Sequence, residues 1–203
     1  KLKSSERALD DEAALTPEAA RKAELYREVA TLAAGRLADA TAEIDALRSA
    51  LAAEPHDRET RDRLCDRLLA AGRQVEAVPF LKLRVDEVEA TVEKIRLLKV
   101  LATVHEQDAH DPEAAFATST RILDLQPSDP DALDCMERID IAAERHDRLL
   151  ETLGYRASTL EGAARAQIYA RMGALSHTRL ADFDRATEYF AQALDIAPTD
   201  PPT

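Results

Sequence analysis

The sequence repeats itself at an interval of 71 to 72 residues, and this internal repetition limits the possible folds more than any other feature. Residues 23–57 align with residues 166–200 without a gap, and a third copy at residues 94–129 lies between them. A proline stands near the end of each copy: Pro55, Pro127 and Pro198. A fixed period of this kind is typical of repeat architectures, in which each unit packs against its neighbours.

A second, more divergent repeat occupies the gaps between these copies. Residues 57–93 align with residues 129–164 at an offset of 72. This alignment pairs Arg84 with Arg156. The two repeat types therefore alternate along the chain and predict five helical hairpins, at residues 17–55, 57–93, 94–127, 129–160 and 161–198.

Composition and periodicity both indicate an all-α fold. The chain has 5 glycines and 4% aromatic residues, whereas a β-sandwich or barrel needs more aromatic and β-branched residues. Apolar side chains in the last repeat recur at the spacing of a helix face, at Leu180, Phe183, Ala186, Phe190, Ala193 and Leu194.

The helix boundaries can also be read from the sequence. Asp111 and Asp129 are each followed by a proline, which predicts an N-cap and a proline in the first helical turn. Thr16 opens a similar signal for the first helix. The prolines at the repeat ends close the second helices, because proline cannot continue a helix. Pro79 lies inside an expected helix and predicts a kink or a late start there.

The last repeat resembles the tetratricopeptide repeat family. The residues that carry the resemblance are Tyr169, Met172, Gly173, Ala186, Phe190, Ala193 and Pro198. One extra residue separates Gly173 from Ala186 relative to the family's standard length, and all three copies of this type share it. Glu43 stands where the family has Ala, and Ser119 where it has Phe. The interleaved hairpins keep little beyond Gly72 and Ala77.

The resemblance implies a right-handed α-α superhelix, or solenoid, of about five hairpins. We expect a single repeat domain over residues 17–200. Residues 1–16 are a flanking segment that is either helical or disordered. Residues 201–203 are the truncated start of a further repeat or a tail, which suggests a fragment of a longer array.

In families of this architecture, the first helices of successive hairpins line a groove that receives peptides or helices. The corresponding positions here are Glu24, Arg27, Thr31, Asp62, Asp66, Arg96, Lys99, Thr103, Glu106, Asp134, Arg138, Gln167, Arg171 and His177. Arg96, Lys99 and Arg138 could together hold an acidic group of a peptide. The alternative is that they are ordinary surface charges. The chain has no Asn, so it lacks the Asn–Lys carboxylate clamp of the chaperone-binding members.

The net charge of −12 argues against nucleic acid and anionic membrane surfaces as partners. The acidic surface either keeps the protein in solution or faces a basic partner. Cys65 and Cys135 fall in different repeats, so we expect buried free thiols. There is no signal peptide and no apolar run of membrane-spanning length. A cytoplasmic location is therefore the default, although the chain begins with Lys1 and an upstream targeting segment is compatible with that start.

Motifs for catalysis, cofactors or metals are not found in the sequence. The nearest is His105-Glu106 followed by His110, but a zinc protease needs its two histidines four residues apart on one helix face. We expect His56, His110 and His146 to be exposed neighbours of aspartates that cap helices.

Two hypotheses on function follow from the sequence. The first is a protein–protein interaction scaffold that binds a peptide or protein partner in the groove. The alternative is a structural spacer or self-assembly segment of a larger multidomain protein. An enzyme would require a catalytic domain elsewhere, and no enzymatic activity, cofactor or metal is expected of this chain.

Overall fold

The computed structural model describes residues 2–37 and 39–198. In this part of the chain there are α-helices and three short π-helical turns, and no β-strand, which confirms the all-α prediction. The helices are α1 (Leu2–Leu15), α2 (Ala19–Leu32), α3 (Ala40–Ala53), α4 (Arg58–Ala70), α5 (Gln74–Glu87), α6 (Thr91–Thr103), α7 (Pro112–Leu125), α8 (Pro130–Ala142), α9 (His146–Ser158), α10 (Gly162–Leu175) and α11 (Phe183–Ile196).

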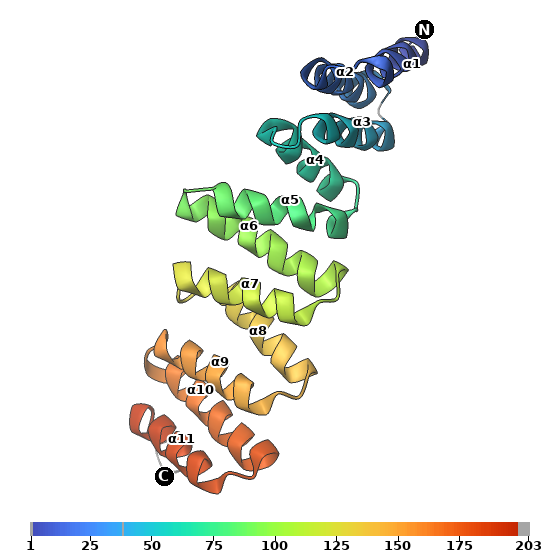
Figure 1. Cartoon of the computed structure of the whole chain (residues 1–203). Coiled ribbons are helices and arrows are strands. Elements are labelled where there is room, and N and C mark those ends of the chain that lie inside the picture. Colours follow the sequence, from blue (N-terminus) through green and yellow to red (C-terminus); the bar gives the residue numbers. More distant parts are fainter. Residues whose placement is uncertain (1, 38, 199–203) are drawn as a thin grey trace. The chain divides into compact units, whose positions relative to one another are not determined.

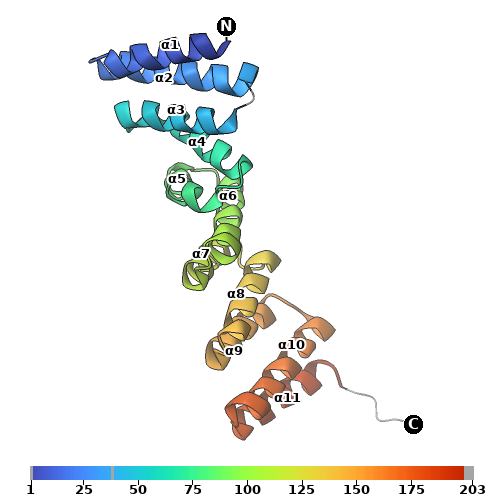
Figure 2. The same ribbon diagram turned by 90° about the vertical axis from the view of Figure 1, so that its right-hand side faces the viewer.

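The helices form two compact units that divide after Val88: unit 1 holds α1–α5 and unit 2 holds α6–α11. Within each unit, helices that are neighbours in sequence lie side by side, as both views show (Figures 1 and 2). The pairs α2–α3, α4–α5, α6–α7, α8–α9 and α10–α11 confirm the five predicted hairpins. The handedness of the superhelix and the single domain over residues 17–200 stay predictions.

The flanking segment 1–16 contains a helix, α1, which packs against α2. Residues 201–203, where the start of a further repeat was expected, lie outside the described residues. The second helices end two residues before a proline in each odd-numbered hairpin: α3 before Pro55, α7 before Pro127 and α11 before Pro198.

Each unit buries its own apolar core. In unit 1 the largest buried side chains are Leu25, Ile44, Leu47, Leu64, Leu68 and Leu81. In unit 2 one cluster joins α9 to α10 through Leu149, Leu150, Leu153, Ala157, Ile168 and Met172. A smaller cluster of Ala115, Cys135 and Ile139 joins α7 to α8. The cores therefore sit between hairpins as well as within them, as stacked repeats require.

The extra residue of the odd-numbered hairpins is taken up by a π-helical turn. These turns are η1 (Ala33–Leu37), η2 (Val104–Asp108) and η3 (Ser176–Leu180), and each follows the first helix of its hairpin. A π-helical turn accommodates one more residue than an α-helical turn. The amide of Asp111 closes one such turn by donating to the His105 carbonyl at 2.8 Å, and that of Asp182 donates to Ser176 at 3.0 Å.

The aspartate after each π-helical turn also caps the next helix. The carboxylates of Asp39, Asp111 and Asp182 each accept a hydrogen bond at 3.0 Å from the third amide that follows. Such N-caps satisfy an amide that has no partner within the helix. One residue type therefore both ends the first helix and begins the second.

Some predicted helix starts are confirmed and others are wrong. Asp57 and Asp129 cap α4 and α8 through their carboxylates, as expected. Asp147 does not cap α9, because this helix already begins at His146 and its N-cap, Arg145, makes no side-chain bond.

The signals at Thr16 and Pro79 also need correction. Thr16 does not cap α2; its hydroxyl donates to the Glu12 carbonyl of α1 at 2.8 Å, and Glu18 precedes α2 without a side-chain cap. The late helix start at Pro79 is wrong, since α5 begins at Gln74 and runs through the proline. Proline has no amide hydrogen, so the α-helical bond to the Val75 carbonyl cannot form.

In the even-numbered hairpins, whose residues are all described, no π-helical turn separates the two helices. The left-handed residue, which in the third and fifth hairpins is His110 or Ala181 after the π-helical turn, here lies two residues after the end of the first helix. Gly72 (φ 73°) ends α4, and Glu144 (φ 53°) ends α8 at the equivalent place. In both turns the next amide donates to a carbonyl five residues earlier, from Arg73 to Leu68 and from Arg145 to Asp140, each at 2.9 Å. Glycine adopts this backbone without the steric cost that a side chain adds.

We predict that Glu144→Gly raises the free energy of unfolding by about 1 kcal/mol, because it removes left-handed strain from a helix end. The matched control is Glu151→Gly, an exposed position within α9, which should lower stability by about the same amount because glycine disfavours a helix interior. Urea denaturation followed by circular dichroism measures both. Equal shifts of the same sign in the two variants would contradict this interpretation of the turn.

Candidate protein-binding surface

A groove of about 250 Å³ in unit 2 brings together five of the predicted site residues. It is formed by α6, η2, α7 and α8, so that the first helices of two successive hairpins face each other across it. The predicted residues along it are Lys99, Thr103, Glu106, Asp134 and Arg138. The other lining residues, which were not predicted, are Ala102, Gln107, Ser119, Ile122, Asp131, Ala132 and Cys135.

The charges of this groove are paired within the protein. Lys99 Nζ lies 2.7 Å from the buried carboxylate of Asp129 and 2.8 Å from that of Asp131. The hydrogen bond to Asp129, followed by that to Asp131, raises the pKa of Lys99. On the opposite wall, Arg138 donates two hydrogen bonds to Glu106, at 3.0 and 2.9 Å. These bonds lower the pKa of Glu106 against the opposing effect of burial.

The predicted basic trio is accordingly not a set of free cations. Arg96 donates two hydrogen bonds to Glu93 one turn earlier in α6, at 2.8 and 2.6 Å, and does not line the groove. Lys99 and Arg138 hold the carboxylates just described. An acidic peptide would have to compete with these internal carboxylates, so binding of an acidic group at the trio stays a prediction.

Apart from Asp134, which lines the groove, the predicted residues of unit 2 described here lie outside it. Asp134 accepts a hydrogen bond from Arg156. Arg171 on α10 donates to Glu137 on α8 at 2.7 Å, and Arg156 lies 2.6 Å from the same carboxylate. Gln167 is exposed on α10, and the ring of His177 packs edge-on against Phe183 with centroids 5.3 Å apart. The structure does not bring Gln167, Arg171 or His177 to the groove.

Unit 1 carries an equivalent hollow of about 460 Å³ beside α2, α3 and α4. Its lining residues are Arg27, Leu47, Glu54, Asp57, Glu59, Thr60 and Arg63. Arg27 holds Glu54 at 2.9 Å and Asp57 at 2.6 Å. Burial alone would raise the pKa of Asp57, but hydrogen bonds from Thr60 and the charge of Arg27 outweigh it and lower this pKa.

An ion pair between a basic side chain and an aspartate therefore occurs at equivalent positions in both units. The pairs Arg27–Asp57 and Lys99–Asp129 are 72 residues apart in sequence. Each connects the first helix of an odd-numbered hairpin to the N-cap aspartate of the following hairpin. These contacts fasten successive hairpins to each other on the side where the predicted groove lies.

Three predicted residues of α2 share a second hollow of unit 1, whereas the two predicted residues of α4 do not line it. Glu24 pairs with Arg21 of the same helix at 2.8 Å. Thr31 donates to the Arg27 carbonyl at 2.8 Å and, with Glu24 and Arg27, lines a hollow of about 420 Å³ beside α1. Asp62 and Asp66 on α4 line neither hollow. Asp62 lies 3.8 Å from Arg58 and from Arg61, and Asp66 accepts from Arg84 at 2.8 Å.

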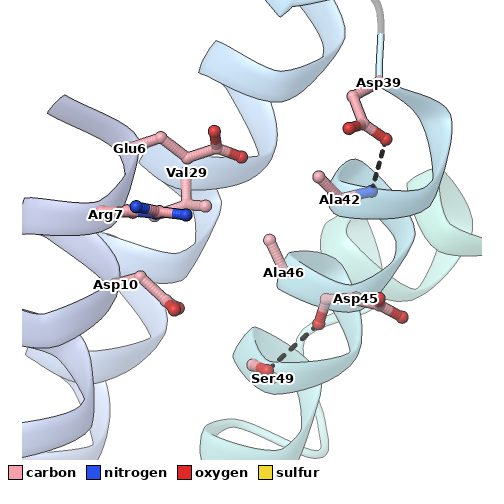
Figure 3. Close-up of a pocket in the computed structure, with 9 residues that line it drawn as sticks. All are labelled: Glu6, Arg7, Asp10, Val29, Asp39, Ala42, Asp45, Ala46 and Ser49. Atoms are coloured by element: carbon pink, nitrogen blue, oxygen red, sulfur yellow. Dashed lines mark hydrogen bonds between the residues drawn. The ribbon is translucent and has the colours of Figure 1, made fainter. Parts of the chain in front are cut away.

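A further groove in unit 1, of about 450 Å³, lies between α1, α2 and α3 and was not predicted (Figure 3). Its lining residues are Glu6, Arg7, Asp10, Val29, Asp39, Ala42, Asp45, Ala46 and Ser49. The Asp39 carboxylate is already engaged in capping α3, and Ser49 donates to the Asp45 carbonyl at 3.1 Å. These internal bonds engage Asp39 and Ser49 within α3 and its N-cap.

Cys65 and Cys135 are both buried and free, as predicted. Burial raises the pKa of Cys65 to about 11 and also raises the pKa of Cys135, so both stay thiols at neutral pH. Among the described residues, no group of three or more His, Cys, Asp or Glu side chains is arranged to hold a metal ion. No helix in the described part of the chain has the length and apolar character needed to cross a bilayer.

We predict that Glu106→Gln lowers the free energy of unfolding at pH 7 by about 0.5–1 kcal/mol, a range that allows for the exposure of Arg138. The pKa of Glu106 is lowered in the folded state, so its contribution is present above the unfolded pKa of about 4.3 and is lost as the pH falls through the folded value. The difference between variant and wild type should therefore disappear on acidification. A difference that persists unchanged at low pH in urea titrations would contradict the ion pair.

Comparison with known proteins gives similarity only to solved structures. No family model matches the sequence, and no curated protein matches it. The structure of the MamA protein is 18% identical, with a TM-score of 0.47, and the match covers 89% of this chain and 98% of that one. YrrB, described as a TPR protein with an unusual peptide-binding site, is 17% identical, with a TM-score of 0.45 and 86% of each chain covered.

A third solved structure, pilF of Pseudomonas aeruginosa, is 17% identical, with a TM-score of 0.42 over 98% of this chain and 86% of that one. The 71–72-residue repeat and the paired helices are properties of this chain itself. On these properties, the chain is an all-α array of helical hairpins, the last of which resembles a tetratricopeptide repeat.

Proposed function

We propose that the chain is a protein–protein interaction scaffold that binds a peptide or protein segment in the groove of α6, α7 and α8. The observation that supports the proposal is that Lys99, Thr103, Glu106, Asp134 and Arg138, which the family resemblance places in the groove, line one hollow. Concave sites with a few convergent polar groups are common ligand-binding sites.

The proposal gives this chain no catalytic role and no cofactor. A protein partner is favoured over nucleic acid because the net charge is −12. The cytoplasmic location stays a prediction. The even-numbered hairpins contribute α4 and α8 to the grooves, so the divergent repeats belong to the proposed surface as much as the regular ones do.

The test is retention of partner proteins from a host-cell extract on the immobilised chain. We expect Arg138→Gln and Lys99→Gln to reduce retention of discrete partners about fivefold or more, because each variant leaves an unpaired carboxylate in the groove. Lys82→Gln, on the exposed side of α5 in unit 1, is the matched control and should retain the partners. Unchanged retention by both the Lys99→Gln and the Arg138→Gln chain would exclude this groove.

A second candidate function, self-assembly, is favoured by a different observation. Apolar side chains of α11 and its N-terminal end are exposed, at 61% for Phe183, 39% for Phe190 and 52% for Leu194. Exposed apolar surface of this kind can mark an interface.

For the assembly candidate, light scattering over a range of concentrations should show a mass that grows with concentration. The variant Leu194→Asp should keep the mass of a single chain, because burying a carboxylate in an apolar contact is costly. A monomer at every concentration in the wild-type chain would exclude assembly through α11.

A further inference from the structure

The two even-numbered hairpins dock on equivalent helix faces. In unit 1, α4 packs on α3, and in unit 2, α8 packs on α7. Residues 72 positions apart therefore hold equivalent places in the two junctions. The ion pairs Arg27–Asp57 and Lys99–Asp129 have the same sense in both, with the cation on the first helix and the aspartate on the docked helix. This shared contact would form equally well if α4 and α8 exchanged places.

A buried carboxylate distinguishes the junction of α3 with α4. Glu43 on α3, which stands where the resembled family has alanine, is only 1% exposed. One of its oxygens accepts a hydrogen bond from Arg63 at 2.9 Å, and Nε of Arg67 lies 2.7 Å from the other oxygen. Both arginines belong to α4. The docked helix thus supplies the charges that a carboxylate needs when it is removed from water.

The junction of α7 with α8 carries no charge at these three positions. The residues 72 positions later are Ala115, Cys135 and Ile139, which pack together as a buried cluster. If α8 docked on α3, Glu43 would face Cys135 and Ile139 and would lose both arginines. Burying a carboxylate without a partner is strongly unfavourable. The exchange of α8 for α4 on α3 is therefore disfavoured.

A second difference disfavours the opposite exchange. In unit 2, Arg138 on α8 donates hydrogen bonds to Glu106 at 3.0 and 2.9 Å. The equivalent positions in unit 1 hold Asp66 and Ala34. If α4 docked on α7, Asp66 would lie opposite Glu106, and two carboxylates would replace an ion pair. Like charges at short distance repel, so each even-numbered hairpin matches the face that it covers and not the equivalent one.

We propose that these two contacts, Glu43 with Arg63 and Arg67 and Glu106 with Arg138, determine which even-numbered hairpin docks on which odd-numbered one. Chains built from similar hairpins misassemble by pairing the wrong elements, within one molecule or between two copies. The unlike contacts reserve α4 for α3 and α8 for α7 in both situations. This role is independent of whether the groove binds a partner.

The test compares full chains refolded from urea with the same chains never unfolded, at several protein concentrations under reducing conditions. Size-exclusion chromatography with light scattering measures the fraction of chains in species that are heavier after refolding. Assembly through α11 occurs in both samples, so the difference between them reports wrong pairing. Circular dichroism checks that the heavier species keep the native helix content. Heavier material without native helix content is aggregation and counts against the proposal.

The decisive variant combines Glu43→Ala, Arg63→Cys and Arg67→Ile, which gives α3 and α4 the lining found between α7 and α8. We expect it to fold, and its heavier fraction after refolding to exceed that of the wild type about fivefold or more, because α3 then accepts α8 as well. The control combines Arg63→Lys with Arg67→Lys, which keeps both charges and should refold as the wild type does. A folded triple variant that also refolds as the wild type does would overturn the proposal.

A second variant decides the matter if the triple variant fails to fold. Glu106→Ala with Arg138→Asp gives unit 2 the residues found at the equivalent positions of unit 1. We expect its heavier fraction to rise about twofold or more, because α4 then meets no opposing carboxylate on the face of α7. Glu106→Asp with Arg138→Lys keeps the signs of the charges and should match the wild type. The same heavier fraction in the Ala–Asp variant and the wild type would overturn the proposal.

Discussion

Each helix in the described part of the chain has an apolar face that it cannot bury by itself, and the fold depends on neighbouring helices to cover these faces. In unit 1, α3 lies between α2 and α4, and Leu47 is completely buried there. In unit 2, α7 lies between α6 and α8, and Ile122 is buried. The last described helix, α11, packs on α10 but has no following helix in the described part of the chain. At the register of Leu47 it carries Phe190, which is exposed.

Aspartate at the helix starts gives this packing its regular spacing. After each π-helical turn an aspartate joins two helices, with its amide closing the turn and its carboxylate capping the next helix. At the start of the even-numbered hairpins, Asp57 and Asp129 cap a helix and also hold Arg27 and Lys99 of the preceding hairpin. The groove is therefore lined by the same charged side chains that connect successive hairpins. Most of these charges are already paired with each other within the protein.

The sequence predicted the hairpins and most of their caps because these depend on local patterns. The extra residue near Gly173 was visible in the sequence, but its accommodation as a π-helical turn depends on hydrogen bonds that no periodicity reveals. The basic trio was predicted on one face, yet the partners of Lys99 and Arg138 come from residues about 30 positions away, across a hairpin boundary. Ser119 stood out as a departure from the family pattern. Only the structure shows that Ser119 on α7 and Cys135 on α8 lie together along the same groove.

The stability of α3 depends on the helices that pack against it on both sides, and amide hydrogen exchange of α3 measures this dependence most directly. A chain that ends at residue 88 keeps the whole of unit 1, whereas a chain that ends at residue 53 removes α4 and α5. Protection against exchange reports the free energy of local opening. We predict strong protection of the α3 amides in the longer chain and protection factors about tenfold or more lower in the shorter chain. Equal protection of α3 in both chains would contradict it.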